Sequence, residues 1–435
     1  MNLLVILSAL LYAAAFIIPY QLLWCIIPAF IIIFFLGFTQ KLSFTTGFVW
    51  GIIAYGLHMF PAFYCLYTTT GQTGLFVGWF FLTIYMALFS AAWFYAGTQL
   101  ARFCYRVVVW VLVTWLYILI MDGYFLCIFD YWEGYCCLHP LVPVMVYPQL
   151  LYFLPILGMQ GSTLLFLLVT ALCALFFITR LFVCLIIVLL GLLMGGYILR
   201  VPTHVKPAWL CKIACARVPC MPLKKINSLE RAQDIYLAVQ EIMTRAPQIE
   251  LVLMPESTLP CALNICSQTC ACLVQTSNQV DLILGSHRAE PDGIYNCCYW
   301  LRGGQVHNYY NKQHGVLFAE RMPRLFDYSP LRSLIVWQPD LFVQSTQERP
   351  VFTLFEHEFI PLVCSDLFFA RANPAQSPTQ ILLCLINDAW FLGCSVPDLL
   401  FFSACLKARA WGQPLLYVSY TRAVLCMANG TLYEI

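Results

Sequence analysis

Three side chains of types that act together in acyl transfer stand at the ends of short apolar runs in the second half of the chain. Glu256 follows the run 251–255, Lys312 ends a hairpin expected at 295–311, and Cys364 follows the run 359–363. In a site of this kind a carboxylate takes the thiol proton, a cation holds the developing oxyanion, and sulfur makes the covalent bond. The sequence therefore predicts a thiol-dependent acyl-transfer site built at strand ends.

The chemistry of a thiol sets what its neighbours must supply. A free thiol has a pKa of about 8.5 and needs a nearby base or cation to be mostly thiolate at neutral pH. We expect Glu256 and Lys312 to supply both for Cys364. A thioester suits a two-step transfer, because an amine attacks it faster than it attacks an ester.

Strands that alternate with helices must position these side chains. A helix is expected over 227–247 with Ser228 as its cap, and another near 397–411. Glycine pairs and Asn-Gly steps mark hairpins at 303–304 and 429–430. Strands are expected at 250–254, 280–286, 295–302, 305–311, 359–363, 380–386, 414–419, 422–427 and 431–435. This alternation indicates a layered α/β sandwich.

The first half of the chain has a different composition. Residues 1–199 hold only four of the 23 basic and three of the 21 acidic side chains, which indicates a membrane domain. We predict a transmembrane domain of about seven helices over 1–200 and a hydrolase-like domain over 201–435. A net charge of +2 and the lack of a basic patch give no reason to expect a nucleic-acid partner. The expected spans lie near 3–20, 22–38, 43–67, 74–97, 107–129, 162–179 and 181–199.

The loops between these spans predict the orientation. The four basic residues of the first half lie in the loops near 39–42 and 98–106 and at residue 180, which fall on one side if there are seven crossings. By the positive-inside rule that side is cytoplasmic. The amino terminus is then expected in the cytoplasm and residues 201–435 outside it. One span more or fewer would reverse this assignment.

The 22 cysteines invite two other interpretations. Their spacings match zinc sites poorly and the seven histidines are scattered, so we expect no metal. If the second domain lies outside the cytoplasm, disulfides within the clusters are reasonable, although the sequence does not give their connectivity. The clusters are Cys211, Cys215 and Cys220; Cys261, Cys266, Cys270 and Cys272; and Cys297 with Cys298.

The order of these segments resembles the carbon–nitrogen hydrolase (nitrilase) superfamily. With a membrane domain before them, they are similar to its membrane-anchored branch, the apolipoprotein N-acyltransferases. The stretches that carry the resemblance are Pro255-Glu256, YNKQHGVLFAERMP at 310–323, NDAWF at 387–391 and KARAWGQPL at 407–415. The resemblance implies a multi-span helical domain followed by an α-β-β-α sandwich.

The resemblance also implies a role for each site residue. It makes Glu256 the general base, Lys312 the oxyanion stabiliser and Cys364 the nucleophile. Glu320 would orient Lys312 or share the proton, and Asn387 and Trp390 would shape the loop that closes on the site. The implied reaction is ping-pong: an acyl chain passes from a membrane phospholipid, through a thioester, to the terminal amine of a lipoprotein's diacylglyceryl-cysteine. No cofactor is expected, and the implied location is the bacterial inner membrane with the catalytic domain on the periplasmic side.

Two departures from the family pattern keep other functions open. An aromatic residue and a glutamate usually follow the nucleophile, whereas Ser365 and Asp366 stand here. Asp366 keeps the charge but is one methylene shorter, so we expect its hydrogen bonds to shift by about 1 Å. The sequence stops at Ile435, so we also expect a domain shortened at its carboxyl end. The alternatives are a membrane-anchored amidase that uses water and a degenerate, non-catalytic homologue that serves as a membrane scaffold.

Overall fold

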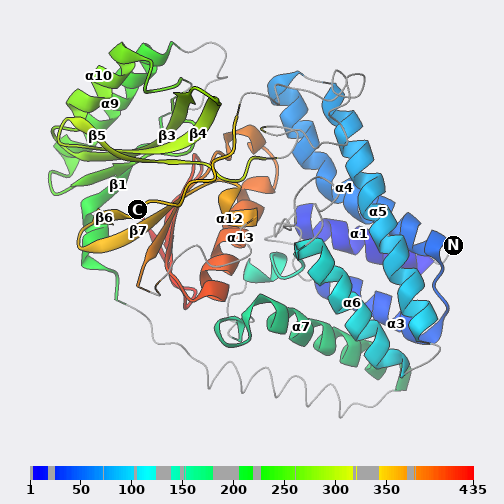
Figure 1. The fold of residues 1–435 in the computed structure, drawn as a ribbon. Coiled ribbons are helices and arrows are strands. Elements are labelled where there is room, and N and C mark those ends of the chain that lie inside the picture. Colours follow the sequence, from blue (N-terminus) through cyan, green and yellow to red (C-terminus); the bar gives the residue numbers. More distant parts are fainter. Residues whose placement is uncertain are drawn as a thin grey trace. The chain divides into compact units, whose positions relative to one another are not determined.

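The computed structural model describes most of the chain. The described residues are 3–17, 25–71, 73–101, 105–123, 139–146, 151, 153–179, 205–218, 227–259, 261–316, 320, 342–369, 377 and 379–435. The chain forms two compact units, Met1–Pro202 with Phe391–Leu406, and Thr203–Trp390 with Lys407–Ile435. Figure 1 shows the helices of the first unit and the two sheets of the second.

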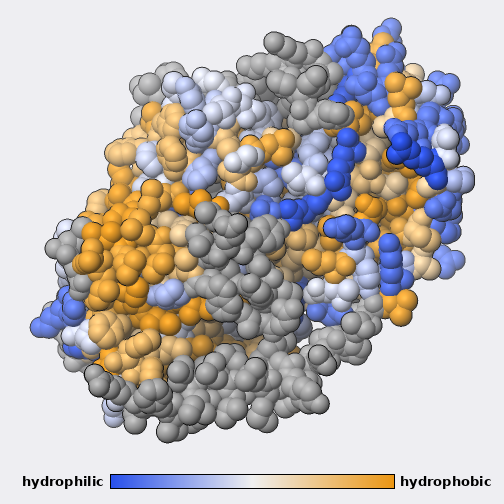
Figure 2. All heavy atoms as spheres, turned by 180° about the vertical axis from the view of Figure 1, so that it is seen from behind, coloured by the Kyte–Doolittle hydropathy of each residue, from blue (hydrophilic) through white to orange (hydrophobic). Residues whose placement is uncertain are grey.

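The first unit is built from apolar helices. They are α1 (Leu3–Ile17), α3 (Ile26–Thr39), α4 (Phe44–Thr70), α5 (Gly74–Leu100), α6 (Arg106–Gly123), the 3-10 turn η4 (Pro143–Val146) and α7 (Leu154–Thr179). Within the described ranges, three helices are long and apolar enough to cross a membrane: Phe44–Thr69, Gly74–Leu100 and Leu154–Thr179. Phe80, Tyr95 and Phe177 on these helices are more than half exposed, and Figure 2 shows apolar side chains gathered on this unit.

The expected spans agree with these helices to different degrees. The spans at 43–67 and 74–97 coincide with α4 and α5, and the span at 162–179 is the carboxyl-terminal part of the longer α7, which is interrupted at Gly158. The spans at 3–20, 22–38 and 107–129 correspond to the shorter apolar helices α1, α3 and α6. The span at 181–199 lies outside the described residues.

The second unit contains two mixed sheets. The first has the order β1-β2-β3-β4-β5, with β1 to β3 parallel and β3 to β5 antiparallel. Its strands are β1 (Ile213–Cys215), β2 (Leu251–Leu253), β3 (Asp281–Glu290), β4 (Gly293–Arg302) and β5 (Gln305–Asn311). Gly303 and Gly304 both have positive φ, as the predicted two-residue turn between β4 and β5 requires.

The second sheet has the order β11-β10-β9-β8-β7-β6, with β7, β8 and β9 parallel. Its strands are β6 (Phe352–Leu354), β7 (His357–Val363), β8 (Ile381–Leu385), β9 (Leu415–Val418), β10 (Ala423–Cys426) and β11 (Leu432–Glu434). The short helix α12 (Asp366–Phe369) follows β7, the 3-10 turn η9 (Ala389–Phe391) follows β8, and α13 (Val396–Trp411) leads to β9.

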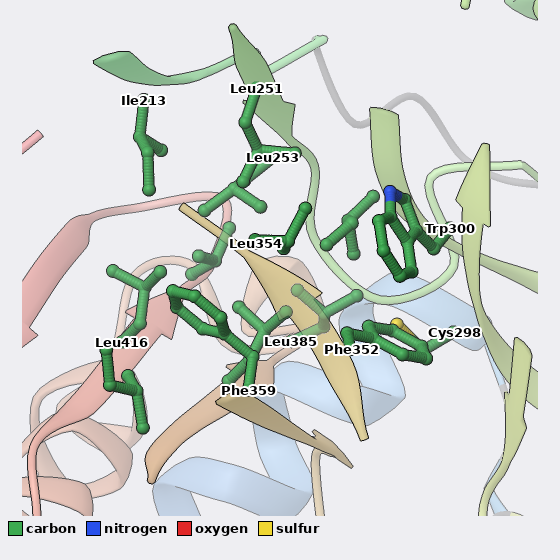
Figure 3. Close-up of a cluster of buried hydrophobic side chains, with 14 of the residues drawn as sticks. Ile213, Leu251, Leu253, Cys298, Trp300, Phe352, Leu354, Phe359, Leu385 and Leu416 are labelled. Carbon is green, nitrogen blue, oxygen red and sulfur yellow. The ribbon is translucent and has the colours of Figure 1, made fainter. Parts of the chain in front are cut away.

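The two sheets pack face to face through buried apolar side chains. Leu253 and Trp300 of the first sheet and Phe359, Leu385 and Leu416 of the second belong to one cluster, which Figure 3 shows. On its other face the first sheet is covered by α9 (Ser228–Arg245) and α10 (Ser267–Thr276), with Ile235 and Leu273 buried against it. The predicted architecture, an apolar helical domain followed by an α/β sandwich, is confirmed.

One local prediction was wrong. The helix predicted over 227–247 is capped by Asn227, whose side-chain oxygen accepts a hydrogen bond from the backbone N–H of Leu229 at 2.9 Å. Ser228 is instead the first helical residue. Both residue types are good caps, so the sequence did not decide between them.

Candidate active site

The ends of β2, β5 and β7 bring Glu256, Lys312 and Cys364 together. Lys312 Nζ lies 3.0 Å from Glu256 Oε1 and 2.8 Å from Glu320 Oε2. The Cys364 thiol is hydrogen-bonded to the Glu256 carboxylate, and the charge of Lys312 acts on it. Glu256 and Lys312 are buried, with relative exposures of 4% and 3%. Four side chains predicted from three separate segments of the sequence therefore share one small site.

Backbone hydrogen bonds to β3 place Glu256. The pairing between β2 and β3 continues beyond β2, because Met254 N donates to Ile283 O at 2.8 Å and Gly285 N donates to Pro255 O at 3.1 Å. Glu256 then lies directly against the backbone of Gly285. An added Cβ on Gly285 would stand 2.4 Å from Glu256 Cα, so only glycine permits this approach.

We expect Gly285→Ala to reduce acyl transfer by about 10²-fold, because displacement of a catalytic group by about 1 Å has a cost of this size. The reason is that the new Cβ meets backbone atoms of Glu256 and Ser257, which cannot rotate away. The measurement is the rate of acyl-enzyme formation. Gly78→Ala on α5 is the control, since a Cβ there meets only a Phe63 ring carbon at 3.7 Å. Equal activity in both variants would contradict the placement of Glu256.

Cys364 occupies a strained turn immediately after β7. Its φ is +47°, a left-handed conformation that is uncommon for a residue with a side chain. Its backbone N–H donates to Leu385 O of β8 at 2.8 Å, which fixes the turn to the neighbouring strand. The residue as a whole is partly exposed. This arrangement holds the sulfur at the end of the strand, turned toward Glu256.

The groups around Cys364 act on the pKa of its thiol in opposite directions. Burial and the carboxylate of Glu256 raise the pKa of the Cys364 thiol well above its ordinary value, and Lys312 only partly opposes them. Burial also raises the pKa of Glu256, with Lys312 acting in the opposite direction. A buried carboxylate with a raised pKa is a stronger base, and it accepts a hydrogen bond from the thiol. Proton transfer to Glu256 would therefore accompany the attack by sulfur.

Asn296 joins the two carboxylates and was missed in the sequence. Its Nδ2 donates to Glu256 Oε1 at 2.7 Å and to Glu320 Oε1 at 2.8 Å, and its backbone oxygen accepts from Lys312 N at 2.8 Å. Asn296 is buried in β4. The available signal was an amide in the middle of an otherwise apolar strand, since buried amides need partners.

Asn387 contributes through its backbone, and its neighbour Asp388 was also missed. Asn387 N donates to Glu256 Oε2 at 3.0 Å. The buried Asp388 carboxylate accepts hydrogen bonds from Tyr420 N at 3.0 Å and from the Thr421 hydroxyl. The Tyr420 hydroxyl in turn donates to Glu256 O at 3.4 Å. The turn after β9 therefore binds both Asp388, which is next to Asn387, and the backbone of Glu256.

Trp390 lies three residues beyond Asn387, in η9, and is partly exposed. Its part in closing the site stays a prediction.

Asp366 connects the turn that carries Cys364 to the loop that follows Lys312. Its fully buried carboxylate accepts hydrogen bonds from Val363 N, Tyr310 Oη, Gln313 N and His314 N at 2.8–3.1 Å, and lies 3.1 Å from His314 Nδ1. The Ser365 hydroxyl also donates to His314 O. The Ser-Asp pair that departs from the family pattern therefore has a full set of partners in this chain.

We expect Asp366→Asn to lower the free energy of unfolding at pH 7 by about 3 kcal/mol, because an amide leaves buried N–H donors without a charged acceptor. Although burial favours the neutral acid, the His314 hydrogen bond and charge hold the pKa of Asp366 below its ordinary value. A depressed pKa stabilises the fold above the unfolded-state pKa and loses that effect as the pH falls. The difference in the free energy of unfolding between parent and variant should therefore become smaller below about pH 4. Urea unfolding at several pH values measures this difference. A difference that stayed constant with pH would contradict this role.

Comparisons with known proteins show what this chain is similar to. No family model matches the sequence. The chain is 28% identical over 236 residues to an apolipoprotein N-acyltransferase of Sinorhizobium medicae, covering 48% of this chain and 44% of that protein. It is 27% identical over 178 residues to the Helicobacter pylori protein of the same name, covering 40% and 41%. The match thus spans less than half the length of these relatives.

Solved structures give weaker likenesses. A nitrilase-superfamily amidase from Nesterenkonia superposes with a TM-score of 0.37 and 18% identity, over 51% of this chain and 88% of that one. A glutamine-dependent NAD+ synthetase from Acinetobacter baumannii gives 0.36 and 16%, over 48% and 41%. Over about half of its length, this chain is similar in sequence to the apolipoprotein N-acyltransferases, as its catalytic segments predicted.

Proposed function

We propose that this protein is an N-acyltransferase that moves an acyl chain from a membrane phospholipid, through a thioester on Cys364, to the terminal amine of a lipoprotein's diacylglyceryl-cysteine. The observation that carries the proposal is the meeting of the Cys364 thiol, the Glu256 carboxylate and the Lys312 ammonium in one buried site. The similarity to the apolipoprotein N-acyltransferases supports the choice of substrates.

In the first half-reaction, Glu256 takes the thiol proton as sulfur attacks the ester carbonyl carbon. The two carboxylates engage two of the three Nζ–H donors of Lys312, and the third stabilises the oxyanion. The tetrahedral adduct then collapses, the ester C–O bond breaks, and the leaving oxygen takes the proton from Glu256. The products are a lysophospholipid and the acyl-thioester.

In the second half-reaction, the lipoprotein amine attacks the thioester carbonyl. Glu256 removes a proton from the attacking nitrogen, and Lys312 again stabilises the oxyanion. The C–S bond breaks, the amide forms, and the proton held by Glu256 returns to sulfur. The enzyme is thereby restored with its thiol protonated.

The direct test mixes the purified full chain with a phospholipid labelled in one acyl chain and a synthetic diacylglyceryl-cysteine peptide. We expect one labelled amide and one lysophospholipid for each turnover, measured by mass spectrometry. Hydrolysis of small amides without lipid would instead indicate the amidase. Failure of Cys364 to form an adduct with either substrate would indicate the non-catalytic scaffold.

We also propose a multi-pass location in the bacterial cytoplasmic membrane, with the amino terminus in the cytoplasm and the site on the periplasmic side. The basic loops at Lys41, Arg102, Arg106 and Arg180 support it. Cys211 is exposed and lies in the second unit. A membrane-impermeant maleimide added to intact spheroplasts should label Cys211, and labelling only after lysis would reverse the orientation.

A further inference from the structure

The loop that follows Glu256 brings two thiols together outside the acyl-transfer site. Cys261 lies five residues beyond Glu256, and Cys266 is the N-cap residue of α10. Between them, Ala262 O accepts hydrogen bonds from Ile265 N at 3.1 Å and from Cys266 N at 3.2 Å, so the chain turns back on itself. The Cys266 thiol also interacts with the Cys261 thiol and contributes to its raised pKa, and both cysteines are free in the structure.

The backbone around this pair is held by β3. Cys261 O accepts from His287 N at 3.1 Å and from the Ser286 hydroxyl at 2.8 Å, and Leu263 N donates to His287 O at 2.9 Å. A disulfide forms only where the two side chains already approach closely, because its geometry is narrow. A turn held by these hydrogen bonds, with the two thiols interacting across it, favours this geometry.

The neighbouring groups that the structure describes show which other thiols lie near this pair and give no sign of a metal site. Cys270, one helical turn beyond Cys266, interacts electrostatically with Cys261 and Cys266, whereas the pKa of Cys272 responds to burial alone. Across the part of the chain that the structure describes, no group of three Cys, His, Asp or Glu side chains could hold a metal ion. Both Cys261 and Cys266 are partly exposed, so an external disulfide can reach them.

We propose that Cys261 and Cys266 form an intramolecular disulfide that cross-links the loop following Glu256. The oxidant is a small or protein disulfide, RSSR, reached by thiol–disulfide exchange. The Cys266 thiolate attacks one sulfur of RSSR, which leaves a mixed disulfide and releases the first RSH once solvent protonates the leaving thiolate. Cys261 then attacks the Cys266 sulfur, forms the internal bond and releases the second RSH. Two protein thiols are oxidised and one external disulfide is reduced.

The order of the two attacks follows from the environment of Cys261. Burial, together with the Cys266 thiol, raises the pKa of Cys261 to about 12. Cys261 is therefore protonated at neutral pH and makes the poorer first nucleophile. Once Cys266 carries the mixed disulfide, the proximity of Cys261 favours the internal attack.

The test equilibrates the purified full chain with oxidised glutathione and blocks free thiols with N-ethylmaleimide. A phosphine reductant and iodoacetamide then mark the cysteines that had been oxidised, and mass spectrometry locates both labels. We expect the second label on Cys261 and Cys266 and the first on Cys272. Cys272→Ser is the matched control and should keep the linkage, whereas Cys266→Ser should lose it.

Two outcomes would overturn the proposal: maleimide on both Cys261 and Cys266, or a bond from either of them to Cys270.

Thermal stability provides a second measurement. The oxidised chain should melt about 5 °C above the reduced chain, because closing the short loop restricts the unfolded state. A Cys261→Ser/Cys266→Ser double variant should show no such difference. No acylation is measured, so failure here leaves the proposed acyl transfer unaffected.

Discussion

Replacing Cys364 with alanine is expected to lower kcat/KM for acyl transfer by at least about 10⁴-fold, because both half-reactions of the proposed pathway pass through a thioester on this sulfur. The variant should also carry no acyl chain after incubation with labelled phospholipid. In the parent protein the label should be released by neutral hydroxylamine, which cleaves thioesters readily. This property separates a thioester on Cys364 from an ester on the adjacent Ser365, whose hydroxyl donates to His314 O.

Cys272→Ala is the matched control for this experiment, because it removes a partly buried thiol from α10, outside the site. It should keep both the adduct and the activity. Because Cys364 packs against the core between the sheets, thermal melts must show that Cys364→Ala remains folded. Acylation by that variant at the rate of the parent would refute the thioester mechanism.

Glu256→Gln is expected to reduce the rate of acyl-enzyme formation by about 10³-fold, within the range that general-base catalysis contributes. Glutamine has nearly the same shape, keeps one oxygen that can accept from either Lys312 or Asn387, and cannot take the thiol proton. The pKa of Glu256 is raised, first by burial, so the carboxylate is protonated and inactive as a base at low pH. The parent rate should therefore rise as the pH passes through this raised value, and the variant should lack that rise.

Single-turnover acylation measured across the pH range tests both parts of this prediction. Glu250→Gln is the control, since Glu250 lies just before the same strand but is half exposed and pairs with Lys212 at 2.7 Å. It should retain the parent's rate and pH profile. A Glu256→Gln variant that kept the rise with pH would show that another group accepts the proton.

Much of the second unit could be predicted from the residues. Apolar runs bounded by turn residues predicted β7 and β8 to within two residues, and the hairpin signal at 303–304 predicted β5 without error. Such runs are reliable because a strand between two packed layers must be apolar on both faces. The helix limits were less certain, as the cap at Asn227 shows, because neighbouring polar residues can serve equally.

For the candidate site, the residues alone were enough to predict the side chains at the strand ends, because Glu256 and Cys364 each follow a recognisable apolar run and Lys312 ends a hairpin. How these side chains act on one another became clear from the fold. It brought in Asn296 and Asp388, whose partners come from distant segments, and it required glycine at 285 through contact between backbones. It also raised the pKa of Cys364, because burial depends on what packs around a thiol and not on the residues beside it in sequence.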